Sequence, residues 1–479
     1  MKLSLLAYPD NLHVSQSNNK PPGPVVSLQD KGKVTKQSMQ RSLMSTAVCA
    51  ALLLVGTLGA FPQSKAVPMS ANPIEPTSFG FSCNFDRPDA CERARWITTV
   101  SQPGTLRMHD TGTTWQRLTS GPNSYRWTNL DLWLDAIAVH QPLAVLFTFN
   151  RVACWNVRES RSECMSRGSP GSPDPPRDLT ADGSPSFNAF VDAVTKHCSP
   201  AHHCVKDYIK YFEMWNEPNT PRYWNGTVEE LYEMVKPAAA IIRANVPGVL
   251  ISTPAPFMAV NPSWMDEWLA LENKRGRISD IYGFHAYIGP GDTWFNDNNA
   301  PERRFVENIM EMVNKKNNAG WTTTPWMNTE TGFLGSGPYD CPLDKGATHA
   351  MCGAFMARWL IAQFALGAQN IDWYWFSSIG PQDAIYSHLM QWLVGAHFPH
   401  ACTHEGGTVE CPLVQANGQD ALIVWNFSSD CKGAGCGTPT SYTAKSQFRT
   451  ATDLTGNTAA VPANHVVGIG ASPLLLAMQ

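Results

Sequence analysis

The chain has 479 residues, a formal net charge of −4 and a charged fraction of only 16%. Its length suits one large domain with an accessory domain rather than a single small module. The sparse charge and slightly acidic balance argue against nucleic acid and against an anionic membrane surface as partners. The 17 tryptophans are many for this length, and they fit either a large core or aromatic platforms for sugar rings.

The N-terminal 66 residues predict a disordered leader followed by a secretory signal peptide. Residues 1–38 are polar, rich in Pro, Gly, Ser and Lys, and without periodicity. Arg41 then precedes an uncharged stretch over residues 43–61, and a small-x-small site ends at Ala66. This pattern is typical of a signal for export to the extracellular space or the periplasm. The alternative is an uncleaved membrane anchor through residues 43–61, which are just enough to span a bilayer.

Cysteine spacing also indicates export. Thirteen cysteines less Cys49 in the leader leave twelve, and these fall in close sequential pairs, which predicts local disulfides in an oxidising compartment. The predicted pairs are Cys83–Cys91, Cys154–Cys164, Cys198–Cys204, Cys341–Cys352, Cys402–Cys411 and Cys431–Cys436. The stretch CSPAHHC also allows a zinc site. Its two cysteines are too near each other to leave both histidines good tetrahedral positions, which favours the disulfide.

Short apolar runs alternate with amphipathic stretches of helical period from about residue 77 onward. The runs that predict strands are residues 79–82, 105–110, 143–150, 211–217, 249–256, 281–288, 325–333 and 370–378. The stretches that predict helices include residues 227–245, 263–274, 303–316 and 349–366. Thr227 and Glu230 have capping-box spacing at the start of one helix. This alternation predicts an α/β fold, a closed (β/α)8 TIM barrel over residues 67–395, in place of an open doubly wound sheet.

Two segments depart from the alternation. Residues 154–178 form a long loop rich in Pro, Gly and Ser, with a cysteine at its start and another within it. Loops of this length are usually functional or disordered. Over residues 396–479 the helical period is lost, and short strand-like runs alternate with Gly and Asn turns, which predicts a small C-terminal β-sandwich domain.

Functional side chains of a (β/α)8 barrel lie at the C-terminal ends of its strands. The polar and aromatic residues expected there are Arg107, His109, Asn150, Asn216, Glu217, His285, Tyr287, Glu330, Trp373 and Trp375, with Asp110 as a weaker candidate. Glu217 and Glu330 follow the fourth and seventh strands, so they face each other across the barrel mouth. Glycoside hydrolysis requires two carboxyl groups in different environments, one with a raised pKa that keeps its proton and one that stays ionised. Arg107 is placed to keep Glu330 ionised, because a fixed guanidinium favours the charged form.

Several motifs carry a resemblance to a known group of enzymes. WNEPN (215–219) and NTETGF (328–333) resemble the retaining glycoside hydrolases of clan A, whose acid/base and nucleophile follow these two strands. LRMHDTGTTWQRL (106–118) and YRWTNLDLWLDAI (125–137) are similar to a subgroup near family 39, which includes β-xylosidases, α-L-iduronidases and bacterial exopolysaccharide endoglycosidases. The resemblance covers roughly residues 78–380. The stretch RVACWNV after the third strand departs from the subgroup's pattern, which leaves the substrate open.

The resemblance implies hydrolysis of O-glycosidic bonds in a poly- or oligosaccharide by double displacement, with Glu217 as general acid/base and Glu330 as nucleophile. It further implies that Asn216 binds the sugar 2-hydroxyl and Arg107 orients Glu330. Tyr287 would donate a hydrogen bond to the nucleophile, with His285 as the alternative donor. The ring of Trp375 would form the floor of the sugar subsite, with Trp373 as the alternative. His109 and Asn150 remain candidate substrate contacts.

No metal and no organic cofactor is needed for this reaction, so none is expected. Two other functions use the same residues. The barrel would be a carbohydrate-binding protein without turnover if catalysis had been lost, or a transglycosylase if water were kept from the acceptor side. The linkage, and exo or endo action, stay open at this point.

Overall fold

The computed structural model describes residues 72–83, 88, 104–141, 144–158, 161–166, 171–288, 306–333, 349–375, 382–405, 407–427 and 439–478. The predicted leader and signal peptide, and the alternative anchor over residues 43–61, lie outside the described residues and stay predictions. Within the described part of the chain, no helix combines the length and the apolar character needed to cross a bilayer.

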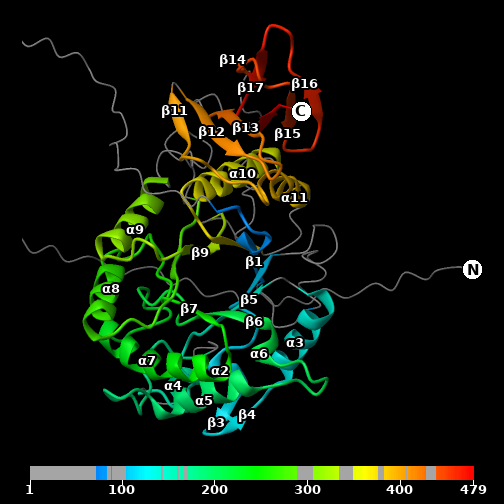
Figure 1. The fold of residues 1–479 in the computed structure, drawn as a ribbon. Helices are drawn as coiled ribbons and strands as arrows, with labels where there is room; N and C mark the ends of the chain where they lie inside the picture. Colours follow the sequence, from blue (N-terminus) through cyan, green and yellow to red (C-terminus); the bar gives the residue numbers. More distant parts are fainter. Residues whose placement is uncertain are drawn as a thin grey trace, which may run out of the picture. The chain divides into compact units, whose positions relative to one another are not determined.

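Eight parallel strands form a single sheet with helices around it (Figure 1). The strands are β1 (Phe79–Cys83), β2 (Thr105–Met108), β5 (Ala144–Thr148), β6 (Ile209–Glu213), β7 (Leu250–Ser252), β8 (Tyr282–His285), β9 (Trp326–Thr331) and β10 (Asn370–Trp375). They follow one another in chain order around the sheet, and β10 pairs with β1. A parallel bridge between Ser252 and Ile281 joins β7 to the residue before β8. The predicted (β/α)8 TIM barrel is therefore confirmed.

The helices alternate with these strands. They are α2 (Trp115–Leu118), α3 (Thr128–His140), α4 (Arg161–Ser166), α5 (Pro185–Lys196), α6 (Val205–Tyr208), α7 (Val228–Asn245), α8 (Trp264–Arg275), α9 (Val306–Asn318), α10 (His349–Ala365) and α11 (Gln382–Leu393). A 3-10 turn, η1 (Pro76–Ser78), precedes β1, and a hairpin of β3 (Thr119–Gly121) and β4 (Ser124–Tyr125) follows α2. In α7, Leu231, Val235, Ala238 and Ile242 recur at helical spacing and are fully buried, which is the pattern of a helix packed on a sheet.

The barrel strands are buried on both faces, as expected when helices cover a parallel sheet. Every residue of β2, β5, β8 and β9 is buried. Their inner faces also carry polar and charged side chains, so the barrel interior is not a purely apolar core. On β1, Gly80 lies against one of these side chains. A Cβ at Gly80 would come within 1.6 Å of Oδ1 of Asp372 on β10, so that strand position has no room for a side chain.

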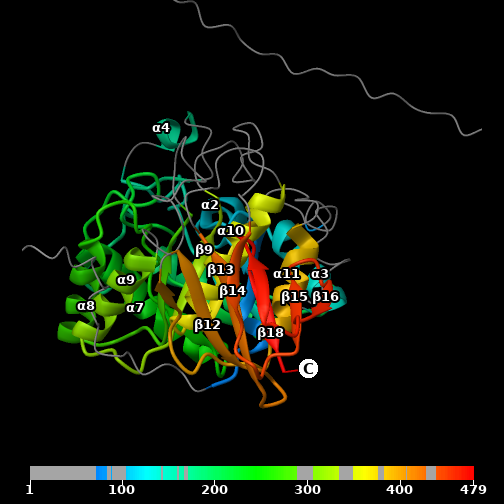
Figure 2. The ribbon, with the colours of Figure 1, turned by 90° about the horizontal axis from the view of Figure 1, so that it is seen from above.

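The C-terminal residues form two packed β-layers (Figure 2). The larger sheet contains, in spatial order, β11 (Thr403–Glu405), β12 (Thr408–Val414), β13 (Asp420–Asn426), β18 (Leu474–Ala477), β15 (Thr450–Asp453) and β16 (Thr458–Ala460). The second layer pairs β14 (Thr440–Thr443) with β17 (Val466–Ile469). Leu422, Val424, Val467, Ile469 and Leu476 form a small core that joins the two layers. This arrangement agrees with the predicted β-sandwich.

Three of the predicted disulfides are formed in the described residues, Cys154–Cys164, Cys198–Cys204 and Cys402–Cys411. Cys352 is also disulfide-bonded. Its predicted partner Cys341 lies outside the described residues. The predicted pairs Cys83–Cys91 and Cys431–Cys436 involve residues outside the described part as well, so they stay predictions.

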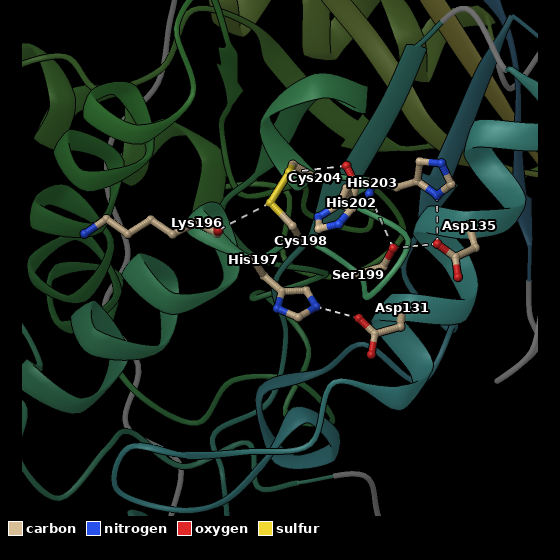
Figure 3. Close-up of a disulfide and its surroundings, with 9 residues drawn as sticks. All are labelled: Asp131, Asp135, Lys196, His197, Cys198, Ser199, His202, His203 and Cys204. Carbon is tan, nitrogen blue, oxygen red and sulfur yellow. Dashed lines mark hydrogen bonds and ion pairs between the residues drawn. A yellow bond between two sulfur atoms is a disulfide. The ribbon is translucent and has the colours of Figure 1, made fainter.

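Histidines next to the Cys198–Cys204 disulfide bind carboxylates of α3 and not the sulfurs (Figure 3). His203 Nδ1 lies 2.8 Å from Asp135 Oδ1, and His197 Nε2 lies 2.6 Å from Asp131 Oδ1. Both sulfurs form the disulfide and cannot bind a metal, so the zinc alternative for CSPAHHC is wrong. Hydrogen bonds from the histidines attach this loop to α3.

The capping box at the start of α7 generates a first test. Thr227 Oγ1 accepts from Glu230 N at 3.1 Å, and Glu230 Oε2 accepts from Thr227 N at 2.9 Å. We expect Thr227→Ala to lower the free energy of unfolding by about 1 kcal/mol, because an orphan amide of the first turn loses its acceptor. Thr227→Ser keeps the hydroxyl and serves as the control. Equal urea midpoints for the Ala and Ser variants would contradict the assigned role of the cap.

Candidate active site

A fully buried arginine lies at the centre of the predicted site. Arg107 projects from β2, and its Nη1 donates to Glu330 Oε2 at 2.5 Å. Its Nη2 donates to Glu213 Oε1 at 2.5 Å and to Asn216 Oδ1 at 2.7 Å. A buried charge is tolerated when it is paired and hydrogen-bonded in this way. The guanidinium thereby fixes three side chains from two other strands of the barrel.

Two further carboxyl groups, Glu213 and Asp372, lie deep in the barrel, and their pKa values shift in opposite directions. Burial opposes ionisation of Glu213, but the charge of Arg107 and its hydrogen bond to Glu213 outweigh burial and lower the pKa of Glu213. At Asp372 burial dominates and raises the pKa well above its ordinary value, despite the attraction of Arg107. Glu213 is therefore a carboxylate at neutral pH, whereas burial disfavours the charged form of Asp372.

Glu217 stands just beyond the end of β6, on a strained backbone. The prediction that this strand reaches residue 217 is wrong, because β6 ends at Glu213 and a single parallel bridge joins Asn216 to Ala255. Glu217 has φ of 40°, in the left-handed region that few non-glycine residues adopt. Its carbonyl accepts from Thr220 N and from Thr220 Oγ1, both at 3.0 Å, which holds the turn closed.

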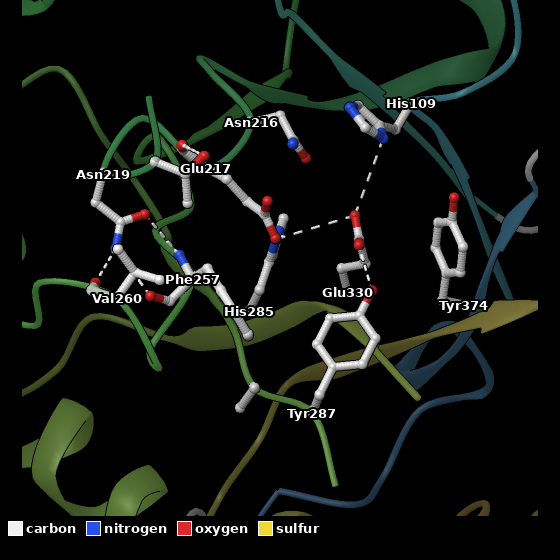
Figure 4. A network of polar contacts seen from close by, with 12 residues as sticks. His109, Asn216, Glu217, Asn219, Phe257, Val260, His285, Tyr287, Glu330 and Tyr374 are labelled. Atoms are coloured by element: carbon white, nitrogen blue, oxygen red, sulfur yellow. Dashed lines mark hydrogen bonds and ion pairs between the residues drawn. The ribbon is translucent and has the colours of Figure 1, made fainter. Parts of the chain in front are cut away.

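Asn219 fastens this turn to the segment that follows β7. Its Nδ2 donates to the Phe257 carbonyl at 2.8 Å and also to the Val260 carbonyl (Figure 4). Its Oδ1 accepts from Phe257 N at 2.9 Å. The second asparagine of the WNEPN motif is thus a structural clamp, which explains why amides flank the glutamate on both sides.

The Glu217 carboxyl is largely buried, and burial raises its pKa to about 7. Its neighbour His285 is fully buried, and burial lowers the pKa of that imidazole to about 4, so the ring is neutral at neutral pH. Arg107 Nη2 lies 3.2 Å from His285 Nε2, and because a guanidinium has no acceptor, a proton on Nε2 would point at another donor, which favours an unprotonated Nε2. The imidazole proton is then on Nδ1, which lies 3.1 Å from Glu217 Oε1 and donates to it. This bond occupies one carboxyl oxygen and leaves the other for the proton.

Glu330 lies opposite Glu217, and hydrogen-bond donors hold both of its carboxyl oxygens. Tyr287 donates to Glu330 Oε1 (Figure 4). Arg107 holds the other oxygen, Oε2. Burial and the nearby Glu330 raise the pKa of Tyr287 well above its usual value, so the phenol keeps its proton. His109 Nδ1 lies 3.9 Å from Glu330 Oε2. The sequence prediction offered Tyr287 and His285 as alternatives for the bond to the nucleophile, and Tyr287 makes the shorter contact.

The two carboxyl groups are close together. One oxygen of Glu217, one oxygen of Glu330 and a ring nitrogen of His285 all lie within 4.8 Å of one another. Such a set has the spacing of a metal site, but Arg107 would place its positive charge beside any cation bound to Glu330. The same set also suits acid–base chemistry between two carboxyl groups, and the expectation of no metal stays a prediction.

Several buried polar atoms near the mouth have no hydrogen-bond partner among the described residues. They include Asn150 Oδ1, Asn216 Nδ2 and both ring nitrogens of His109. Asn150 and Asn216 are near in space, because Asn216 N donates to the carbonyl of Phe149 at 3.0 Å. Buried polar groups of native proteins are nearly always paired, so these atoms are well suited to a polar ligand.

On β10 the structure differs from the prediction at two residues, Trp373 and Tyr374. Trp373 is only 1% exposed and packs edge-on against Phe333 in the core, so it offers no face to a ligand. The side chain of Trp375 lies outside the described part of the structure, and its role as a sugar platform stays a prediction. The neighbour between them, Tyr374, which the sequence analysis did not select, donates to Asp110 Oδ2 at 2.6 Å.

Glu213 is the second residue that sequence reasoning missed. Its signal was present, since a glutamate in the middle of an apolar strand is unexpected unless it has a buried partner. Asp110, kept as a weaker candidate, lies at the rim with His109 Nδ1 at 3.3 Å. Burial opposes its ionisation, but His109 and the hydrogen bond from Tyr374 outweigh it and lower the pKa of Asp110.

Comparison with known proteins bears on the fold. No protein-family model matches the chain, and no curated protein sequence matches it. Among solved structures, the chain is similar to a glucosidase from Croceicoccus marinus, with a TM-score of 0.52 at 11% identity over 85% of this chain and 96% of that one. A GH39 β-xylosidase from Caulobacter crescentus gives a TM-score of 0.51 at 14% identity over 86% and 98% of the two chains.

A GH44 endoglucanase from Clostridium thermocellum gives a TM-score of 0.52 at 13% identity, over 85% of this chain and 97% of that one. These proteins share the fold of this chain. At such low identity the likeness is one of architecture, and the chemistry has to be argued from the residues of this site.

The raised pKa of Glu217 predicts a pH-dependent stability difference. Its pKa rises from 4.5 to about 7 on folding, so folding is favoured by the bound proton below the lower value. That stabilisation is lost as pH rises through about 7, and its size is on the order of 3 kcal/mol. Glu217→Gln cannot ionise, so the difference in unfolding free energy between wild type and variant should change by this amount between about pH 4 and pH 8. A difference that stays flat in urea titrations over this range would contradict the assignment.

Proposed function

We propose that the chain is a retaining glycoside hydrolase that acts on a poly- or oligosaccharide. The observation that carries the proposal is the Glu217–Glu330 pair, with oxygens within 4.8 Å of each other at the barrel mouth. Retaining enzymes hold their two carboxyl groups about 5–5.5 Å apart, whereas inverting enzymes need room for a water between them. Because burial raises the pKa of Glu217 to about 7, its carboxyl would keep its proton in about half of the molecules at pH 7 and in most of them at pH 6, whereas Glu330 is bound by Arg107 and Tyr287.

In the first step Glu330 would attack the anomeric carbon. The bond to the leaving oxygen breaks with its electron pair, and that oxygen takes the proton of Glu217. Arg107 and Tyr287 orient the attacking carboxylate, and the free Nδ2 of Asn216 is available to donate to a sugar hydroxyl. The products are a glycosyl ester on Glu330 and an ionised Glu217.

In the second step Glu217, now a carboxylate, would accept a proton from water. The water oxygen bonds to the anomeric carbon as the ester bond breaks, and its electron pair returns to Glu330. The neutral His285, through the proton on Nδ1, stabilises the negative charge that Glu217 holds between the two steps. After both inversions the sugar regains its starting configuration, with Glu217 protonated again.

Two other functions remain candidates under this proposal. A carbohydrate-binding protein without turnover would not need a raised Glu217 pKa beside a buried, fully hydrogen-bonded Glu330. A transglycosylase would pass through the same ester and differ only in the acceptor. The solved structures of similar fold include a glucosidase, a β-xylosidase and an endoglucanase, which favours a carbohydrate substrate. Three disulfides fit an oxidising compartment, in keeping with the predicted export.

Mass spectrometry of the intact protein tests the nucleophile. After incubation with 2,4-dinitrophenyl 2-deoxy-2-fluoro glycosides of pentoses, hexoses and uronic acids, we expect one glycosyl group to accumulate on Glu330. The fluorine slows both steps, and the good leaving group lets the first step proceed. Glu330→Gln is the control and should stay unlabelled. Peptide mapping to another carboxylate, or no labelling of folded protein by any glycoside of the panel, would count against retaining catalysis at this pair.

Leaving-group dependence tests the acid. Glu217→Ala should lower kcat/KM by about 100-fold or more for aryl glycosides whose leaving group needs protonation, since a positioned acid contributes about this much. Ester formation from dinitrophenyl glycosides, which need no acid, should stay within about threefold of wild type. In the wild type, kcat/KM for the poor leaving groups should fall as pH rises through about 7, because Glu217 then loses its proton. Equal losses for both substrate classes would refute the role of Glu217 as acid.

A further inference from the structure

We infer that Glu213 is a positioning residue for the reaction: it holds Arg107 in place and balances its charge when Glu330 becomes an ester. The inference rests on the proposed function and deepens it. Glu213 is neither at the barrel mouth nor within reach of a sugar, since its side chain is fully buried. It would act on the substrate only through the residues it binds.

The geometry links Glu213 to each part of the site. The same Arg107 nitrogen, Nη2, that donates to Glu213 at 2.5 Å also donates to Asn216 at 2.7 Å. The other nitrogen, Nη1, is thereby directed at Glu330. On the far side, Glu213 Oε2 lies 4.0 Å from His285 Nε2, whose ring bonds Glu217. A planar guanidinium has a fixed fork of donors, so the carboxylate that holds one prong sets the direction of the other.

Charge balance gives Glu213 a role that a neutral group cannot fill. In the resting site the positive charge of Arg107 faces two carboxylates at 2.5 Å, Glu213 and Glu330. Formation of the glycosyl ester neutralises Glu330. Glu213 is then the one carboxylate that still bonds the guanidinium among the described residues. Without it, the first step would leave a buried cation with no bonded counter-charge, which is a costly state in a low-dielectric interior.

A role in packing alone makes a different prediction. If Glu213 only filled space, a glutamine of the same shape would keep both the fold and the rate of ester formation. If its charge matters, Glu213→Gln slows ester formation while substrate binding is kept, because the sugar contacts at the mouth are intact. The deficit should persist with a dinitrophenyl leaving group, since it arises at Arg107 and Glu330 and not at the acid.

The experiment measures how fast Glu330 is labelled by the 2,4-dinitrophenyl 2-deoxy-2-fluoro glycoside that labels the wild type, at several concentrations. For Glu213→Gln we expect the limiting rate of labelling to fall about 100-fold, with the half-saturating concentration within about threefold of wild type. Glu213→Asp restores the negative charge on a shorter side chain. Its limiting rate of labelling should be at least tenfold higher than that of Glu213→Gln. Glu272→Gln is the matched control, because Glu272 is also a buried glutamate with hydrogen bonds to Trp268 and Ser279. It should label at the wild-type rate.

A cooperative thermal transition establishes that each variant is folded. A limiting rate for folded Glu213→Gln within threefold of wild type overturns the inference, as does an Asp variant as slow as the Gln variant. If Glu213→Gln does not fold, Glu213→Asp is compared with Glu213→Asn, which has the same length but no charge, and equal limiting rates in these two variants overturn the inference. Wild-type protein that is labelled by no glycoside of the panel instead overturns the proposed function, so the two failures are distinguishable.

Discussion

The ion-pair network around Arg107 is the constraint on which the rest of the site depends. A guanidinium inside a closed barrel has no water to bind, so the surrounding strands must supply its partners. β6 supplies Glu213, the turn after it supplies Asn216, and β9 supplies Glu330. The positions of Asn216 and Glu330, two of the predicted functional side chains, are therefore set by the buried charge of Arg107.

Burial acts in opposite directions on neighbouring groups, and that contrast assigns their roles. Burial raises the pKa of the Glu217 carboxyl to about 7 and lowers the pKa of the His285 imidazole to about 4, so at pH 7 the imidazole is neutral and about half of the Glu217 carboxyls keep their proton. Glu213 is buried more deeply than Glu217, yet it is ionised because Arg107 bonds it directly. The presence or absence of a bonded cation decides between acid and carboxylate here, and depth of burial does not.

The sequence was sufficient for the barrel because each strand is short, apolar and followed by a helix with its own period and cap. It was also sufficient to select Arg107, Asn216, Glu217, Tyr287 and Glu330, which the structure brings together. Strand ends were less predictable, since Met214 and Trp215 are apolar and buried although β6 stops at Glu213. The prediction for Trp373 was wrong because the sequence pattern around a tryptophan at a strand end is the same whether its indole faces the core or the barrel mouth. Glu213 and Tyr374 depend on partners far away in sequence, which no local pattern reveals.

The close contact between Gly80 and Asp372 restricts how this barrel can change over evolutionary time. The space that a side chain at position 80 of β1 would need is already filled by the Asp372 carboxyl. A larger residue at position 80 therefore requires that the Asp372 carboxyl moves away or is replaced by a shorter side chain. The two positions form a coupled pair, in which the order of substitutions decides whether an intermediate sequence can fold. Related barrels with a larger residue at position 80 should therefore also carry a shorter residue at position 372.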